Sequence, residues 1–220
     1  MKNKFFTLFT MCLSLIIDVY AQVPYFAATV GDNKLYGYTS LKFRPGENAQ
    51  ETYTSFQYGL GNSFATGVDL YTGNAGASYA GVLLRYGTKI NSYFNVGFQA
   101  TPTFDLTENM DFSYITTAMY LNGTISKDGK LFWCSNTWWR INKDSKNTID
   151  QYFYLGYSIS LNNGHRITPM LGEIHSWKFN QDVDLALGFY YTIKNWNFYF
   201  WGNDFLKENP RIVVGLDFIM

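Results

Sequence analysis

The stretch Phe94-Asn95-Val96-Gly97-Phe98-Gln99-Ala100-Thr101-Pro102-Thr103-Phe104-Asp105 decides the fold of this chain. Its even-numbered residues are all apolar, whereas its odd-numbered residues are all polar or glycine. An alternation with a period of two is typical of a β-strand whose two faces meet different surroundings. The stretch therefore predicts a strand with one apolar face and one polar face.

The same alternation recurs through the chain, and no helical period persists in it. It predicts twelve strands, near residues 34–45, 51–60, 63–73, 77–89, 93–105, 112–125, 130–143, 148–161, 165–177, 182–193, 196–205 and 211–220. Tight turns follow the even-numbered strands, and mostly longer polar segments follow the odd-numbered ones. An even number of strands lets the first and last strand pair antiparallel, so the sheet can close into a barrel.

The chemistry of the two faces separates a membrane barrel from a soluble one. Only 15% of the 220 residues are charged, against about 25% in ordinary soluble domains, and 20% are aromatic. A β-sandwich or a lipocalin-like barrel would place its polar face in water, where charged residues are plentiful. A nearly charge-free apolar face is instead expected where the outside faces lipid. We therefore predict an all-β, antiparallel transmembrane β-barrel, with a soluble exported β-protein as the alternative.

The first 21 residues are typical of an export signal. A basic start, Met1–Lys4, precedes the apolar run Phe5–Ile17, and Val19–Ala21 fits the small-x-small pattern of a cleavage site. We expect cleavage after Ala21, so that residues 1–21 are a signal peptide and residues 22–220 form a single outer-membrane barrel domain. Cys134 would then be the only cysteine left, which excludes an intrachain disulfide.

With this signal, these segments and the final strand Arg211–Met220, the chain resembles the outer-membrane β-barrels of Gram-negative bacteria. Members of that family commonly end in an amphipathic strand with an aromatic residue at or near the last position. Here Phe218 lies two residues before the end. The resemblance implies a bacterial outer-membrane location, contact with outer-membrane lipid, and insertion by the barrel-insertion machinery, which reads the final strand. We expect a monomer.

The inward face holds the candidate residues for contact with a solute. Arginine can fix polar groups, and Tyr and Trp rings stack against flat ligand surfaces. Arginines and aspartates inside a barrel also form structural ion pairs, so we expect Asp69 and Asp184 to be the counter-charges of the inward arginines. The predicted lumen-lining residues are Arg44, Asp69, Arg85, Gln99, Trp138, Arg140, Asp184 and Tyr190.

The composition excludes several other functions. The 17 Lys and Arg balance the 17 Asp and Glu, which argues against a nucleic-acid-binding protein. The two histidines, ten positions apart, have no metal-ligand spacing of a known type, and no Gly-rich phosphate loop is present. We expect no metal, no cofactor and no enzymatic activity. The sequence favours a porin-like channel for small solutes, and the alternative is a filled barrel with a structural or loop-mediated binding role.

An esterase is a more distant alternative, because the chain lacks a suitable histidine and serine pair. Ser176 directly follows His175, so the two side chains point to opposite faces of a strand. Glu173 and His175 share a face, but it is the apolar face of their strand. We therefore expect a bulge near Pro169 or Gly172 that turns the pair inward.

The apolar face predicts how the protein fractionates. We expect it to sediment with the outer membrane and to require detergent for extraction, because a continuous apolar belt is stable only in lipid or a micelle. Cell fractionation followed by immunoblotting tests this. Recovery in the soluble periplasmic fraction without detergent would contradict the barrel prediction.

Overall fold

The structure of the protein is a computed structural model that describes residues 30–220 apart from 48–49, 74–75, 92, 108 and 177–182. The predicted signal segment lies outside the described residues, so its boundary remains a prediction. The strands are β1 (Leu35–Phe43), β2 (Gln50–Gly61), β3 (Phe64–Thr72), β4 (Ser78–Asn91), β5 (Phe94–Asp105), β6 (Asp111–Thr124), β7 (Leu131–Asn142), β8 (Thr148–Tyr157), β9 (Ile159–Ser160), β10 (Arg166–Ser176), β11 (Val183–Ile193), β12 (Trp196–Asn203) and β13 (Arg211–Ile219).

These strands confirm the predicted pattern. Each predicted strand is present, and its ends lie within two residues of the predicted ends. The predicted eighth strand is interrupted at Ser158, so it appears as β8 and the short β9, which both pair with β10. The barrel wall therefore has twelve strand positions, as the alternation predicts. Among the described residues, no helix is long and apolar enough to span a membrane.

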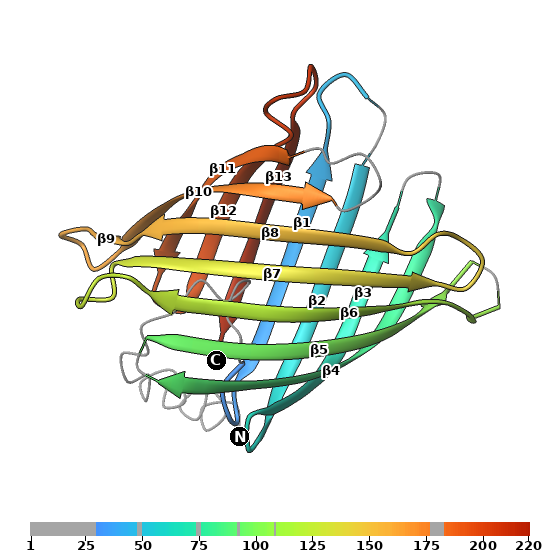
Figure 1. Ribbon diagram of the computed structural model, residues 1–220, viewed down its shortest axis with the longest axis horizontal. Helices are drawn as coiled ribbons and strands as arrows, with labels where there is room; N and C mark the ends of the chain where they lie inside the picture. The colour runs from blue at the N-terminus through green and yellow to red at the C-terminus, as the bar shows by residue number, and fades with distance from the viewer. Residues whose placement is uncertain (1–29, 48–49, 74–75, 92, 108, 177–182) are drawn as a thin grey trace, which may run out of the picture.

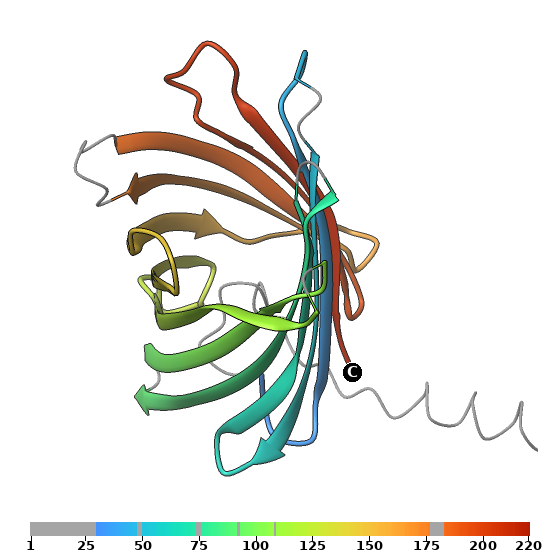
Figure 2. The same ribbon diagram turned by 90° about the vertical axis from the view of Figure 1, so that its right-hand side faces the viewer.

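The sheet closes on itself. Each strand pairs antiparallel with its neighbour along the chain, and β1 pairs with β13 from Tyr36 opposite Ile219 to Phe43 opposite Ile212. The pairing of β10 with β11 completes the ring. Figure 1 shows β4 to β8 and β10 crossing in front of β1 to β3 and β11 to β13, and Figure 2 shows the two walls curving around a common interior.

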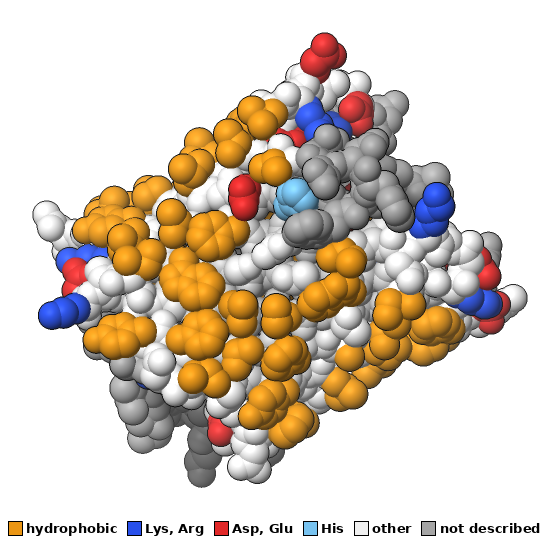
Figure 3. All heavy atoms as spheres, in the orientation of Figure 1, with side chains coloured by type: hydrophobic (Ala, Val, Ile, Leu, Met, Phe, Trp, Pro, Cys, Tyr) orange, Lys and Arg blue, Asp and Glu red, His pale blue; other side chains and the backbone are white. Residues whose placement is uncertain are grey.

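The two faces of the wall differ in chemistry, as predicted. Along β11, Leu187 is 52% exposed on the outside, whereas Tyr190 is fully buried inside. Along β5, Phe98 is outside and 51% exposed, whereas Gln99 is inside and buried. Figure 3 shows hydrophobic side chains spread over the outer face, with most charged side chains gathered toward the two ends. The outer face is thus suited to lipid and the inner face to a polar interior.

The two ends of the barrel are distinguished by their connections. At the terminal end, where β1 begins and β13 finishes, two-residue turns join β2 to β3 (Asn62–Ser63) and β11 to β12 (Lys194–Asn195). Asn62 and Ser63 both have positive φ, the conformation that two-residue hairpins require. At the opposite end, called the loop end here, the longer segment 204–210 joins β12 to β13.

The face assignment can be tested by placing arginine on each side of the wall. We expect Phe98→Arg and Leu187→Arg each to lower the free energy of unfolding by about 2–4 kcal/mol, the cost of a lipid-facing arginine near the bilayer midplane. Tyr79→Arg is the matched control, because Tyr79 lines an open part of the lumen and its cross-strand neighbours, Tyr71 and Asp105, carry no positive charge. Urea titration in lipid vesicles measures the difference. Equal losses at the three positions would show that the faces are assigned wrongly.

Candidate functional site: an aromatic vestibule in the lumen

A cavity, called the vestibule here, occupies the loop-end half of the lumen and is lined by inward residues of β1 to β8. Its volume is about 960 Å³, including the solvent at its open mouth. Seven aromatic side chains line it: Tyr38, Tyr53, Tyr71, Tyr79, Tyr114, Tyr152 and Trp138. The charged lining residues are Lys42, Arg140, Asp69 and Asp150, so both signs are present.

A second cavity, called the side pocket, adjoins the vestibule along β12 and β13. It has a volume of about 630 Å³, including the solvent at its open mouth. The two cavities share the lining residues Ser40, Lys42, Trp138 and Tyr152, so they are adjacent. The remaining residues of the side pocket are Asn136, Tyr154, Tyr190, Tyr199, Trp201, Asn203, Arg211 and Val213.

Glycines shape the wall of this space. Several aromatic residues lie directly opposite a glycine on the neighbouring strand, and a β-carbon at that glycine would overlap the ring. The absence of a side chain lets each ring lie against the wall instead of projecting across the lumen. The pairs are Phe132 with Gly156, Tyr154 with Gly172, Trp201 with Gly188 and Tyr199 with Gly215.

Toward the terminal end the lumen is filled by a packed polar layer. The guanidinium carbon of Arg85 lies 4.1 Å from the centroid of the Tyr120 ring, and Arg85 Nη1 donates to Gln57 Oε1 at 3.3 Å. The Tyr120 hydroxyl donates to Gln99 Oε1 at 2.8 Å. Arg85 is only 5% exposed, and a desolvated cation–π contact contributes about 2 kcal/mol or more. Arg85 therefore has a structural role in this layer.

Asp69 connects the packed layer to the vestibule. Its carboxylate accepts a hydrogen bond of 2.6 Å from the Ser55 hydroxyl, and Ser55 Oγ in turn accepts one of 3.1 Å from Gln57 Nε2. Asp69 also lines the vestibule. The floor of the vestibule is thus continuous with a hydrogen-bonded network, which holds its shape.

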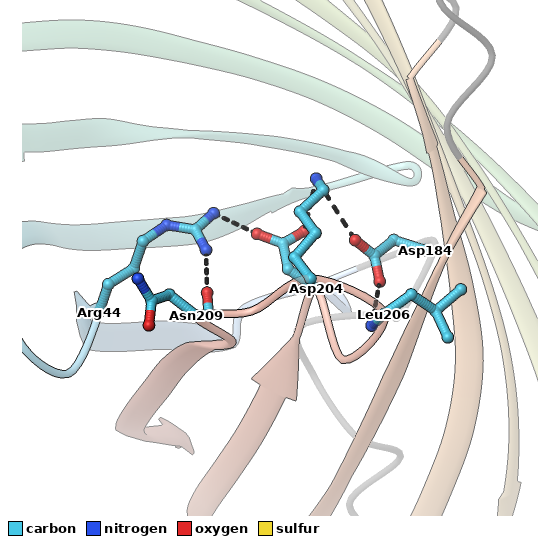
Figure 4. Close-up of polar contacts among 6 residues, drawn as sticks. Arg44, Asp184, Asp204, Leu206 and Asn209 are labelled. Atoms are coloured by element: carbon cyan, nitrogen blue, oxygen red, sulfur yellow. Dashed lines mark hydrogen bonds and ion pairs between the residues drawn. The ribbon is translucent and has the colours of Figure 1, made fainter.

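The loop end carries an ion cluster that fastens the segment 204–210 to the loop-end tips of β1 and β11 (Figure 4). Arg44 forms an ion pair with Asp204, and Lys207 Nζ lies 3.3 Å from the Asp184 carboxylate and 3.5 Å from that of Asp204. The backbone N–H of Leu206 also donates to Asp184 Oδ1 at 3.3 Å. Both aspartates are buried, so these contacts lose little to solvent.

The structure distributes the eight predicted lumen residues over three levels. Four of them, Asp69, Gln99, Trp138 and Arg140, line the vestibule, and Trp138 and Tyr190 line the side pocket. Arg85 belongs to the packed layer, and Arg44 and Asp184 belong to the ion cluster at the mouth. Whether any of them contacts a solute remains a prediction.

The predicted ion pairing is wrong at the mouth. Asp184 is bound by Lys207, and the partner of Arg44 is Asp204. Both partners lie on the connecting segment 204–210, outside any strand, so alternation gives no signal for them. Lys42, which lines both cavities, is not among the predicted lumen-lining residues.

The predicted bulge in β10 is also wrong. This strand pairs with β8 and β11 in an unbroken register, which satisfies its backbone groups on both sides. Glu173 therefore stays on the outer face with Leu171, and His175 has the same parity. Met170 and Ile174 point inward instead and are buried in an apolar cluster with Tyr190 and Trp201.

The chemistry of the vestibule is that of a binding surface. Arg140 lies over the Tyr114 ring, with its guanidinium carbon 4.7 Å from the ring centroid, and its exposed side chain lines the cavity. In the described part of the chain, no group of three or more His, Cys, Asp or Glu side chains could hold a metal ion. Aromatic faces and mixed charges together suit polar solutes with a flat or apolar side.

The chain has the fold of a small porin-type β-barrel. Two solved structures that share it are the KdgM porin in complex with disordered oligogalacturonate (12% identity, TM-score 0.63) and the NanC porin (12% identity, TM-score 0.59). Each alignment covers 83% of this chain and 98% of the other. No protein-family model and no curated protein matches the sequence. At these identities the likeness establishes the fold.

The mouth cluster predicts a response to acid. Burial raises the pKa of the Asp204 carboxyl, but Arg211, Arg44 and Lys207 outweigh it and hold this pKa below the usual 3.8. A depressed pKa in the folded state means that the stabilisation is present above pH 3.8 and is lost as the pH falls through the folded value. We expect the amide protection factors of 204–210, which compare the exchange rate with the intrinsic rate at the same pH, to fall by roughly tenfold when the pH falls below 3.8, or at neutral pH in Asp204→Asn.

Asp128→Asn is the matched control for this experiment. A hydrogen bond from Ser126 lowers the pKa of the Asp128 carboxyl as well, but this residue lies in the connection between β6 and β7, at the terminal end. The control should leave exchange in 204–210 unchanged at neutral pH. Unchanged exchange in Asp204→Asn would show that the ion cluster does not fasten the segment.

Proposed function

We propose that the chain is an outer-membrane channel for small solutes in a Gram-negative bacterium. The vestibule carries this proposal, because it is an open, aromatic and charged cavity inside a closed barrel with an apolar outer face. In outer-membrane barrels the short turns face the periplasm and the longer loops face outward. Because the two-residue turns lie at the terminal end, that end would face the periplasm. The vestibule would then open toward the cell exterior.

The lining residues define how a solute would be held in the proposed channel. Tyr and Trp faces would contact flat or apolar surfaces, while Lys42 and Arg140 would attract anionic groups. The KdgM porin was solved with an oligogalacturonate, which is consistent with a small-solute role for this fold. The porin neighbours also support a channel rather than an enzyme.

A second candidate is a filled barrel with a structural or loop-mediated binding role. The packed layer of Arg85, Gln57, Tyr120 and Gln99 favours it, because these buried side chains occupy the lumen toward the terminal end. In that case the vestibule would be a closed-ended cup open only at the loop end. Conductance separates the two candidates.

We expect the purified protein in a planar bilayer to conduct ions, and Arg140→Glu to shift the reversal potential under a salt gradient toward cation selectivity. Charged side chains in a pore set the sign of its preference, and Arg140 is exposed in the vestibule. Arg140→Gln should give an intermediate shift. Conductance at the level of an empty bilayer would reject the channel and favour the filled barrel.

Arg85→Glu is the contrasting variant. We expect it to lower the free energy of unfolding by at least about 2 kcal/mol, because it removes the contact with Tyr120 and buries an acidic group next to Gln57. Arg140→Glu should change stability little, since its side chain is exposed. Urea titration in lipid vesicles measures both. Equal destabilisation would show that the two arginines have the same structural role.

A further inference from the structure

The side pocket has an unusual balance of charge. Its lining includes Lys42 and Arg211 and no Asp or Glu. Lys42 pairs with Val213 across β1 and β13, and Arg211 lies two residues before Val213 on the same face. The two cations are therefore diagonal neighbours, whose α-carbons lie roughly 7–8 Å apart in such a sheet position. Together they direct two positive charges at one space.

No acidic side chain of the described residues contacts these two cations directly. Among the residues that the structure describes, the side chains of Lys42 and Arg211 form no ion pair and no hydrogen bond, and Arg211 Nε is buried without a partner. Glu51 lies opposite Lys42 in the register and attracts it electrostatically, but the two side chains form no ion pair. Asp204 binds Arg44 and Lys207 (Figure 4). Asp204 also attracts Arg211 without contacting it, so the two cations lack a direct anionic contact, which a bound anion would supply.

Aromatic rings form the wall beside the two cations. Trp201 lies over Gly188 and Tyr154 over Gly172, so both rings are held against the sheet. Their centroids are 4.8 Å apart at an interplanar angle of 61°. The indole N–H of Trp201 donates to the Tyr190 hydroxyl at 3.3 Å, which further fixes the ring. Such a rigid apolar wall suits a planar, apolar ligand surface.

A buried amide completes the pocket. Asn136 is 1% exposed, lines the side pocket, and has its Oδ1 atom buried without a hydrogen-bond partner. It lies on β7 six residues before the loop-end terminus of that strand, deeper in the lumen than Arg211, the first residue of β13. An unpaired buried amide costs free energy unless a ligand group meets it. A hydroxyl can do so, because it both donates and accepts.

We propose that the side pocket binds a planar aromatic carboxylate that carries a hydroxyl group on the far side of its ring. The carboxylate lies at Lys42 and Arg211, the ring lies against Trp201 and Tyr154, and the hydroxyl reaches Asn136. Lys42, Arg211, Asn136, Trp201 and Tyr154 all line this one pocket. This inference rests on the proposed function, since it makes the pocket a solute site on the channel path.

Binding is measured by titration calorimetry on the full-length mature protein in detergent micelles, with 4-hydroxybenzoate as the probe. We expect phenol, which lacks the carboxylate, to bind at least tenfold more weakly, and benzoate, which lacks the hydroxyl, about three- to tenfold more weakly. Cyclohexanecarboxylate should also bind more weakly, because it is not planar. Tighter binding of galacturonate than of 4-hydroxybenzoate would overturn the proposal and favour a sugar acid.

The variants assign each part of the ligand to its residue. Lys42→Gln and Arg211→Gln should each weaken the binding of 4-hydroxybenzoate by about tenfold, because a charge-assisted contact is lost. Asn136→Leu should reduce the affinity for 4-hydroxybenzoate to that for benzoate, and it should leave the affinity for benzoate unchanged. Lys194→Gln, in the turn at the terminal end, is the control and should have no effect. Equal weakening by the control would show non-specific charge attraction and overturn the proposal.

Binding and conduction can fail separately. Calorimetry in micelles does not require an open path, so binding without conductance would reject the channel and keep the side-pocket assignment. Conductance without saturable binding of 4-hydroxybenzoate would reject the side-pocket assignment and keep the channel. Circular dichroism and heat-dependent gel mobility of each variant exclude misfolding as the cause of lost binding.

Discussion

A backbone that crosses a bilayer must find every hydrogen-bond partner within the protein, and the rest of this structure depends on that constraint. Strand pairing continues around the whole barrel, and the pairings of β1 with β13 and β10 with β11 leave no open edge. Once the ladder is closed, the parity of a residue decides whether it faces lipid or lumen. Even Glu173, a charged residue, stays outside, because turning it inward would break pairing on two sides.

The second constraint is the limited volume inside a ring of twelve strand positions. Large aromatic residues at inward positions would meet in the middle if all of them projected along a radius. Opposite glycines instead let rings such as Trp201 and Tyr199 lie on the wall. Space therefore remains at the loop end, whereas Arg85 stacks on Tyr120 in the packed layer toward the terminal end. The barrel is thus asymmetric along its axis, with an open vestibule above a packed layer.

The sequence predicts the wall better than the interior. The alternation in stretches such as Phe94–Asp105 predicts strand ends within two residues and the face of each residue, because both follow from backbone geometry. It does not predict which inward groups meet, because that depends on the strand stagger and on loop segments without periodicity. The sequence predicts an ion pair between Asp184 and an arginine, but Lys207 from the segment 204–210 binds Asp184 instead. The bulge expected in β10 is absent. The prediction took account of one strand alone and not of its pairing with the two neighbouring strands.

The three predicted arginines show why side-chain type alone does not define a site in a barrel. All three come from inward positions or the adjoining strand end, and all carry the same charge. Arg44 at the mouth is neutralised by Asp204, Arg85 is buried against Tyr120, and Arg140 is exposed over Tyr114 in the vestibule. Only Arg140 has an exposed side chain that lines the vestibule, whereas the Arg44 side chain is 26% exposed and ion-paired. The position of an arginine along the barrel axis follows from the closed register. This position therefore decides whether the arginine has a structural role or is available to a solute.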